Sequence, residues 1–444
     1  MQYRRDPMSE EKTFSYSFQA EVPVIAECDV LIVGGGPGGF GAGVMAAKQG
    51  ANVIVAERYG ALGGMASYGE VTPFMPNHAQ GESMDRPVFA AWRKRMWDYF
   101  SDEEKKLHPF DTGDKAPFLS KDIAMLAMED LLLEAGAKIL YHHTLFDVRK
   151  RDGRITEVLF HTKSGLSAVR AKIFIDSTGD GDLAALAGCP VEMGNSEGLC
   201  QPMTTCFKLD HIDAARKPSW QEIGEIYKKA KAEGKLDCLR ENILAFGTLH
   251  DDCIHFNTTR IIRKNATNAL ELSQAEIEGR KEVRKYIKFL RENVPGFENA
   301  QLKSLAHHVG IRETRRIRGL VYQTADDFFK RAKYDDAIAR VNYPIDIHDP
   351  SGSGTTMHYM EKDQWYELRY GTIVPLNSEN LLMGCRAISV DHALHSSSRI
   401  MPAVCSLGQA AGMAAALCLR ENVLPKELDG KKVREALKKE GAFL

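Results

Sequence analysis

The chain has 444 residues, of which 44% are hydrophobic and 27% are charged, and its formal net charge is −2. These values indicate a globular protein of two or three domains, and the near-neutral charge argues against a surface that binds nucleic acid. No unbroken apolar run reaches the roughly 18 residues that a membrane span needs, and residues 1–12 lack the apolar centre of a signal peptide. We therefore expect a cytoplasmic protein with no nucleic-acid or membrane partner.

The nine cysteines are scattered along the chain, and no C-x-x-C pair occurs among them. Buried, reduced thiols are the simplest interpretation, whereas a metal site or a redox disulfide would require closer pairs. The pattern therefore argues against a disulfide reductase, and we expect no metal site.

Residues 28–64 carry the strongest motif, a glycine turn between two apolar runs. Val30–Val33 precede the turn, and Val53–Ala56 follow a stretch of small residues and lead to Glu57. This order predicts a strand, a turn, a helix and a second strand. The turn matches the pattern G-x-G-x-x-G of dinucleotide-binding proteins, through the residues Gly34, Gly36, Pro37, Gly38 and Gly39.

Each part of this unit suits a dinucleotide. Gly34 permits the tight turn, Gly36 lets the backbone approach a pyrophosphate, and Gly39 lets helix and strand pack closely. The start of the helix offers free N–H groups and a partial positive charge to the phosphates. Glu57, at the tip of the second strand, is placed to accept hydrogen bonds from a ribose. The alternative, a glycine-rich turn without a nucleotide, fits this context poorly.

The residues after Glu57 favour a flavin. Arg58 and the run Leu62-Gly63-Gly64-Met65 follow, and a double glycine here suits a chain that runs beside the ribityl and pyrophosphate groups. The stretch resembles the FAD-dependent oxidoreductases of the glutathione-reductase-like superfamily, in the branch that contains the fumarate reductase flavoproteins. The resemblance implies an α/β fold with FAD as cofactor: a Rossmann-like, three-layer FAD-binding domain around a parallel sheet, with an inserted α+β substrate domain.

On this basis we divide the chain into four parts. Residues 1–27 form an N-terminal arm, and residues 28–190 form the first segment of the FAD-binding domain, with a loop-and-helix insertion at 66–118 over the flavin. Residues 191–375 form the substrate domain, within which Ser273 and Glu276 give a capping-box pattern that predicts the start of a long helix. Residues 376–444 return to the FAD-binding domain and add the C-terminal helices.

Further cofactor contacts follow from the resemblance. The backbone at Leu145 corresponds to the place where such flavoproteins meet the adenine. A predicted strand then runs from Ala171 into Thr178-Gly179-Asp180, which is similar to the second nucleotide-contacting motif of the superfamily. The alternative for this turn, an N-cap of the next helix, is compatible with cofactor contact.

The last motif lies in the return segment. Pro402 predicts the first turn of a helix of small residues that continues to Leu419. In the superfamily this helix points its N-terminus at the pyrimidine end of the flavin, where its partial positive charge stabilises the reduced, anionic form. The cofactor candidates in this segment are Gly384, Arg399, Met401 and Gly408.

The candidates for substrate chemistry are arginines and histidines. Arg312 lies in an arginine-dense, strand-like stretch and Arg399 directly precedes the last helix; both suit the binding of an acid group. His348 or His392 would move a proton near neutral pH. The alternatives are structural ion pairs, with Glu313 as a partner, and structural histidines. Arg315 and His395 are further candidates, and Asn257 and Arg260 are weaker ones.

We thus expect an FAD-dependent oxidoreductase that transfers hydride between FAD and a small polar substrate. The chain lacks the His-Gly-x-Asn-Arg run of the fumarate reductases, which puts fumarate itself in doubt. No second G-x-G-x-x-G opens a strand–helix unit, so no NAD(P)H domain is expected and the electron partner is open. The alternatives are a flavoprotein that acts on a macromolecule, as tRNA-modifying relatives do, and a non-catalytic redox sensor. The oligomeric state does not follow from the sequence.

Overall fold

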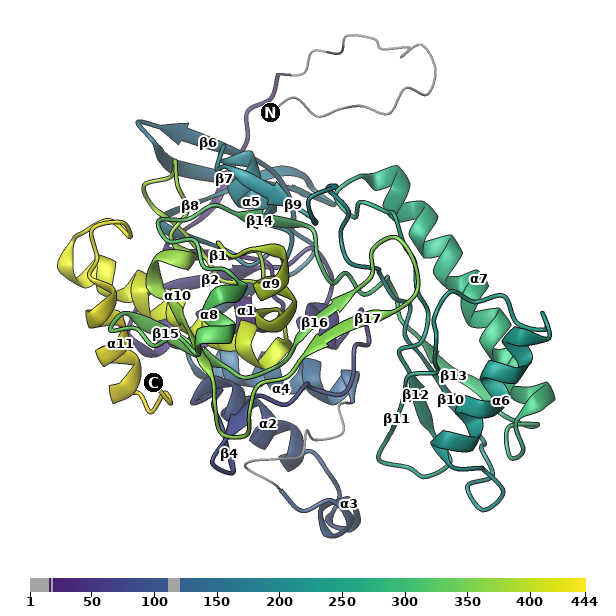
Figure 1. Ribbon diagram of the computed structural model, residues 1–444. Helices are drawn as coiled ribbons and strands as arrows, with labels where there is room; N and C mark the ends of the chain where they lie inside the picture. The colour runs from purple at the N-terminus through teal and green to yellow at the C-terminus, as the bar shows by residue number, and fades with distance from the viewer. Residues whose placement is uncertain (1–15, 17–18, 111–119) are drawn as a thin grey trace.

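The computed structural model describes residue 16 and residues 19–110 and 120–444, and a seven-stranded sheet forms its centre (Figure 1). Most of the predicted arm therefore lies outside the described residues. Five strands run parallel, in the spatial order β5 (Lys138–Leu140), β2 (Val53–Ala56), β1 (Val24–Val33), β8 (Gly165–Asp176) and β19 (Leu381–Met383). The first half of β8 pairs with antiparallel β7 (Arg154–Thr162), which pairs with β6 (Thr144–Arg151). Tight turns at Asp152-Gly153 and at residues 163–164 connect these antiparallel strands.

Two helices from distant parts of the chain pack together beside this sheet. They are α1 (Pro37–Lys48) and α10 (Met401–Glu421), and both contact the parallel strands. A Cβ on Gly408 would lie 1.9 Å from the carbonyl oxygen of Gly38, and one on Gly412 would lie 2.3 Å from that of Ala42. The two backbones therefore touch, which only glycine allows at these positions.

Helix α10 is long and apolar enough to cross a membrane by length and composition, because an 18-residue stretch of it has a mean hydropathy of 1.5. That stretch is 94% buried inside the structure, where α10 packs against α1, β8, β19 and α2 (Val88–Asp98). Trp92 of α2 is fully buried and contacts Phe40, Phe74 and Phe89. Helix α4 (Lys121–Glu134) completes this layer; it buries Ala124, Ala127, Met128 and Leu132.

Residues 207–305 form a separate lobe, drawn in teal on the right of Figure 1. Its antiparallel sheet has the order β11 (Ala245–Gly247), β12 (Ile254–Phe256), β10 (Phe207–Asp210) and β13 (Gln301–Leu305). Helices α6 (Trp220–Ala232) and α7 (Ala269–Asn293) cover one face of this sheet and bury a core of their own.

The remaining elements are short, and those after the lobe contribute to the main core. Four pairs of strands stand apart from the two larger sheets: β3 (His78–Ala79) with β4 (Glu82–Ser83), β9 (Val191–Met193) with β14 (Arg315–Ile317), β15 (Ala337–Val341) with β18 (Tyr366–Arg369), and β16 (Ile345–His348) with β17 (Thr355–His358). The other α-helices are α3 (Asp102–Leu107), α5 (Asp182–Leu186), α8 (Ala325–Lys330), α9 (His392–Ser398) and α11 (Gly430–Lys439).

Two local predictions differ from the structure. Helix α7 begins at Ala269 rather than at Ser273, because the side chain of Asn268 accepts the N–H groups of Leu270 and Glu271 and so caps the helix one turn earlier. The arginine-dense stretch is strand only at Arg315–Ile317, so Arg312 lies in an irregular segment. All nine cysteines are free and buried.

Candidate active site

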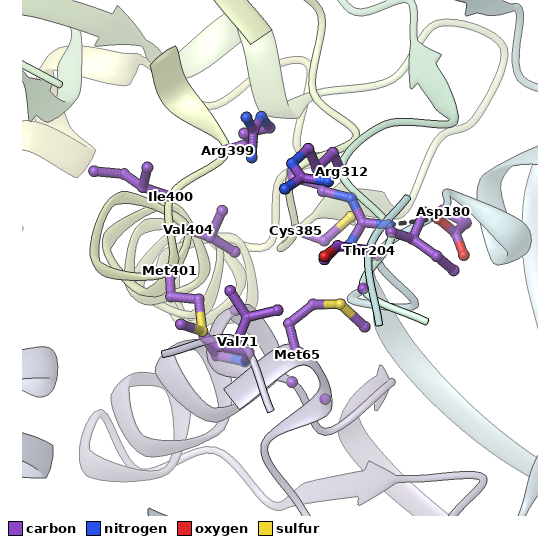
Figure 2. A pocket seen from close by; sticks show the side chains of 18 of the residues that line it. Met65, Val71, Asp180, Thr204, Arg312, Cys385, Arg399, Ile400, Met401 and Val404 are labelled. Atoms are coloured by element: carbon purple, nitrogen blue, oxygen red, sulfur yellow. Dashed lines mark hydrogen bonds and ion pairs between the residues drawn. The ribbon is translucent and has the colours of Figure 1, made fainter. Parts of the chain in front are cut away.

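A cavity of about 1090 Å³ opens between the central sheet, the lobe and the β16–β17 hairpin. Figure 2 shows its interior: α10 is seen end-on with Ile400, Met401 and Val404 at its start, and Arg312 and Arg399 lie across from Met65 and Val71. The volume is at the upper end of the range for ligand pockets, about 300–1,000 Å³. It leaves room for a large ligand.

The glycine turn forms one wall of this cavity. Gly34 has φ +103° and its Cβ position would lie 2.3 Å from the carbonyl oxygen of Ser177, so no side chain fits there. At Gly36, by contrast, an added Cβ would meet no protein atom within 4 Å and would enter the open space. The turn therefore holds the β1–α1 connection close to β8 and leaves bare backbone at Gly36 for a ligand.

Glu57 stands beside this turn at the end of β2. Its Oε2 accepts the N–H of Gly35 at 2.7 Å, and its Oε1 accepts the N–H of Tyr59 at 2.9 Å. The carboxylate is buried yet lines the cavity. These bonds fix its orientation and leave further lone pairs on both oxygens for a ligand.

Helices α1 and α10 both begin at the cavity without a side-chain cap. Their N-cap residues are Gly36 and Ile400, neither of which has a side chain that can accept a hydrogen bond. Both starts therefore present N–H groups and a partial positive charge to the cavity. Pro402 lies in the first turn of α10, as the sequence predicts.

The turn at Thr178-Gly179-Asp180 closes the same side of the cavity. Asp176, at the end of β8, accepts the N–H and hydroxyl of Thr178, at 3.0 and 2.7 Å, and the N–H of Ala184 at 2.8 Å. Burial raises the pKa of Asp176 to about 6, although these hydrogen bonds oppose the rise. Asp180 pairs with Arg386 at 2.5 Å. The turn therefore lines the cavity, whereas the predicted N-cap by Asp180 or Asp182 is wrong: the N-cap of α5 is Gly181, and the hydroxyl of Thr178 accepts the N–H of Asp182 at 2.9 Å.

Most of the predicted cofactor residues line the cavity: Gly34, Gly36, Pro37, Gly38, Glu57, Arg58, Gly64, Met65, Leu145, Thr178, Gly179, Asp180, Arg399 and Met401. Four do not, namely Gly39, Gly63, Gly384 and Gly408. A Cβ on Gly39 would lie 1.9 Å from the oxygen of Gly34, and one on Gly384 would lie 2.7 Å from Ser177 Oγ. The backbone of Gly63 has a left-handed conformation, with φ +109°, and Gly408 packs on the backbone of Gly38. These four glycines allow the backbone packing and turns that shape the site.

The β16–β17 hairpin brings polar side chains to the cavity. Asp346 lies opposite Met357 and His348 lies opposite Thr355, so these four side chains share the face of the hairpin that lines the cavity. Asp346 Oδ1 is 3.4 Å from Nε2 of His348, and its Oδ2 is 3.6 Å from Nη2 of Arg399. The hairpin therefore joins His348 and Arg399 through one carboxylate.

The protonation states of His348 and Asp346 follow from their burial and from the charges around them. Burial lowers the pKa of His348 to about 3, and the positive charge of Arg312 acts in the same direction. Burial would raise the pKa of Asp346, but the hydrogen bond and charge of His348 and the charges of Arg399 and Arg312 outweigh it and hold this pKa well below the usual value. At neutral pH the pair is thus a neutral imidazole beside a carboxylate.

Arg312 has no acidic partner. It donates to the carbonyl oxygen of Pro202 at 2.6 Å and to Oδ1 of Asn257 at 3.4 Å, and no carboxylate in the described part of the chain lies within ion-pair distance of its guanidinium. Burial is the main cause that lowers the pKa of Arg312 to about 9, and the charges of Arg399 and Arg240 lower it further. A half-buried cation without a counterion is costly, so the part of the cavity around Arg312 attracts anions.

Arg240 is a cavity residue that the sequence did not indicate. It is buried in the connection between α6 and β11, lines the cavity, and donates from Nε to Oδ1 of Asn242 at 3.0 Å. A single arginine between a helix and a strand carries no pattern, so no signal could have found it. Tyr343 was missed as well; its hydroxyl donates to Oδ2 of Asp346 at 3.1 Å.

The structure does not bring His392 to the cavity. Its Nδ1 lies 2.9 Å from Oε1 of Glu313, which also binds the buried guanidinium of Arg316. Arg315 instead binds Asp182 at 2.6 Å. The arginine that forms the predicted structural ion pair with Glu313 is therefore Arg316. His392 binds the same carboxylate and so has a structural position.

The three remaining candidates divide in the same way. Asn257 lines the cavity, and Arg260 binds Glu241 at 3.3 Å and the carbonyl of Asp349, so it fastens the hairpin to the lobe. His395 is fully buried in α9, and burial, followed by the charge of Arg316, lowers its pKa well below the usual value. Among the side chains that the structure describes, no group of three His, Cys, Asp or Glu could hold a metal ion.

A comparison with known proteins identifies the family. The model of the family described as FAD dependent oxidoreductase matches residues 29–437 of this chain. The chain belongs to this family. FAD is therefore the cofactor, and the cavity of this FAD-dependent oxidoreductase fits it, because Gly36 opens into free space and the uncapped starts of α1 and α10 suit the pyrophosphate and an anionic flavin.

The similarity to individual proteins is lower. A thiamine thiazole synthase of Methanococcus aeolicus is 28% identical over 162 residues, which cover 34% of this oxidoreductase and 55% of that protein. The chain thus spans about half the length of the curated relative that it matches. Solved structures include a geranylgeranyl bacteriochlorophyll reductase-like protein from Thermoplasma acidophilum (TM-score 0.45, 14% identity, covering 93% of this chain and 84% of that chain) and the flavin-dependent brominase Bmp2 (TM-score 0.46, 13% identity, covering 93% and 83%). These values are too low to indicate a substrate.

Proposed function

We propose that this enzyme transfers a hydride between FAD and a small anionic substrate whose acid group binds Arg312 and Arg399. The observation that carries the proposal is that, among the described residues, Arg312 has no counterion: it donates to two neutral oxygens and faces the cavity. Arg399 lies on the same side and holds its one carboxylate, Asp346, at the long distance of 3.6 Å. An acid group between the two guanidinium groups would supply the charge that this wall lacks.

His348 is the candidate for the residue that transfers a proton to or from the substrate. In the neutral ring, Nε2 donates toward Asp346, and Nδ1 lies 3.2 Å from the hydroxyl of Thr355. An anion on Arg312 offsets one of the two main causes that lower the pKa of His348, so substrate binding raises this pKa and makes the ring a better base. Asp346 then stabilises the imidazolium. FAD supplies the acceptor or the donor of the hydride.

The experiment is an anaerobic titration of the FAD-loaded enzyme with hydroxy acids, unsaturated acids, amines and sugars, followed by flavin absorbance. Oxidisable acids should bleach the oxidised flavin, whereas unsaturated acids should reoxidise flavin that was first reduced with dithionite. Amines and neutral sugars should do neither. If a neutral sugar bleaches the flavin and no acid does, the proposal is wrong. If no small molecule in the panel reacts, the macromolecular substrate takes its place.

A further inference from the structure

Four apolar side chains line the cavity on the side of the lobe and the hairpin. They are Leu244 and Phe246, in and beside β11, and Met357 and Tyr359, in and beside β17. We call these four residues the apolar wall. Within the described chain none of them packs into a hydrophobic core, and Tyr359 is 74% exposed.

Strand alternation explains why the apolar wall faces the cavity. In β11 and the residues just before it, Ile243 and Ala245 pack against the core of the lobe, whereas Leu244 and Phe246 line the cavity. The ring of Phe246 has His255 as its aromatic neighbour, with centroids 6.2 Å apart. Burial lowers the pKa of His255 to about 3, so this neighbour is uncharged and the lobe side of the wall stays apolar.

The hairpin places apolar and charged groups side by side. Met357 is the direct cross-strand partner of Asp346, the carboxylate that contacts Arg399. Side chains of directly paired residues lie about 5 Å apart on one face of a sheet. The apolar wall therefore begins next to the proposed acid-binding group, and a single ligand can touch both.

We infer that the substrate is an amphiphilic acid, with an anionic head on Arg312 and Arg399 and an alkyl or aryl body on the apolar wall. The inference rests on the proposed function for the position of the head and adds the chemistry of the rest of the molecule. Binding becomes more favourable when an apolar part of the ligand covers apolar surface that otherwise faces water in the cavity. A compact diacid would instead place its second carboxylate against Phe246 or Met357, or reach Arg240.

The test uses isothermal titration calorimetry on the FAD-loaded protein with butanoate, hexanoate and octanoate as probes, and with hexanedioate and octanedioate as matched diacids. The dissociation constant should fall by roughly fourfold for each added methylene of the monoacids. The diacids should bind more weakly than the monoacids of the same length. Octanamide, which has the tail without the charge, should bind more weakly than octanoate.

Variants separate the head from the tail. Phe246→Ser should weaken octanoate about tenfold and leave butanoate nearly unchanged. Its matched control is Leu302→Ser, on the opposite edge strand of the same lobe sheet, where Leu302 is 45% exposed and does not line the cavity. Arg312→Ala should weaken every acid in the series.

Each contrary outcome has its own meaning. If octanoate binds no tighter than butanoate while Arg312→Ala weakens both, the amphiphilic substrate is wrong and the acid site stands. If chain length matters but Arg312→Ala changes nothing, the proposed function fails, and the orientation inferred here fails with it. If octanedioate binds tightest and Arg240→Ala removes that advantage, the substrate is a diacid and the inference is overturned.

Discussion

The two halves of the cavity are built in different ways. The cofactor half consists mainly of backbone: the turn at Gly34 and Gly36 and the uncapped starts of α1 and α10. The substrate half consists of side chains, with Arg240, Arg312 and His348 contributed by three separate segments. A backbone site depends on the absence of side chains and a side-chain site on their charge, so mutations should affect the two halves in different ways.

The largest effect should come from Gly408→Val, which acts on the packing beneath the cofactor half. The added Cβ would lie 1.9 Å from the carbonyl oxygen of Gly38, so α1 and α10 must separate. Overpacking costs about 1–3 kcal/mol even where a core can shift, and here the obstacle is backbone. We expect little folded protein and a strongly lowered Tm by calorimetry. Gly224→Val in α6 is the control, because its Cβ would meet nothing within 4 Å.

Gly36→Val should remove FAD and keep the fold. The new side chain enters open cavity rather than protein, and it occupies the space that the pyrophosphate needs. The purified variant should carry almost no flavin absorbance, with circular dichroism like that of the wild type. A variant with full flavin occupancy would show that the phosphates bind elsewhere.

Arg312→Ala and Arg399→Ala should lower flavin reduction by the substrate about a hundredfold, with FAD content and Tm nearly unchanged, because each removes one charge contact to the substrate. The informative contrast is Arg316→Ala, which removes the arginine partner of the buried Glu313. Breaking such a buried pair costs about 3–5 kcal/mol, so this variant should melt early. Equal loss of Tm in all three variants would assign Arg312 and Arg399 to the fold.

The last prediction concerns acid and His348. Its pKa is about 3 in the folded protein and 6.5 in the unfolded reference, so the unfolded state binds more protons between these values. The stabilisation is complete above about pH 6.5 and is lost as the pH falls toward 3, by at most about 1.4 kcal/mol per pH unit. In urea titrations His348→Gln should therefore lose less stability between pH 6.5 and 4 than the wild type. Parallel curves for the two proteins would show that His348 is already protonated in the folded state.

The sequence predicted the cofactor half far better than the substrate half. A glycine turn and its strand encode their geometry locally, so residues 30–57 sufficed to predict β1, α1, β2 and the place of Glu57. Four further glycines were interpreted as cofactor contacts but do not line the cavity, and two of them, Gly39 and Gly408, pack on backbone, because a sequence shows where glycine is needed and not what touches it. Arg240 was missed because it reaches the cavity only through the folding of the lobe.

The substrate candidates show the same limit. His348 lines the cavity and His392 does not, although both were plausible from their positions. The register of β16 with β17 places His348 at the cavity, and the buried pair of Glu313 with Arg316 holds His392 away from it. Neither can be read from residue spacing. Burial and the charge of Arg312 lower the pKa of His348, and both causes arise only in the folded protein.

The contact between α1 and α10 has a consequence for how the protein is made. Helix α1 leaves the ribosome well before the helix that covers its glycine face, which begins at Met401. At about 5–20 residues per second, translation of the intervening chain takes on the order of tens of seconds. During that time the nascent chain carries an uncovered apolar helix and an incomplete cofactor site. We therefore expect nascent chains that end before Leu381 to bind a chaperone and no FAD, and FAD to enter only after β19 and α10 have been added.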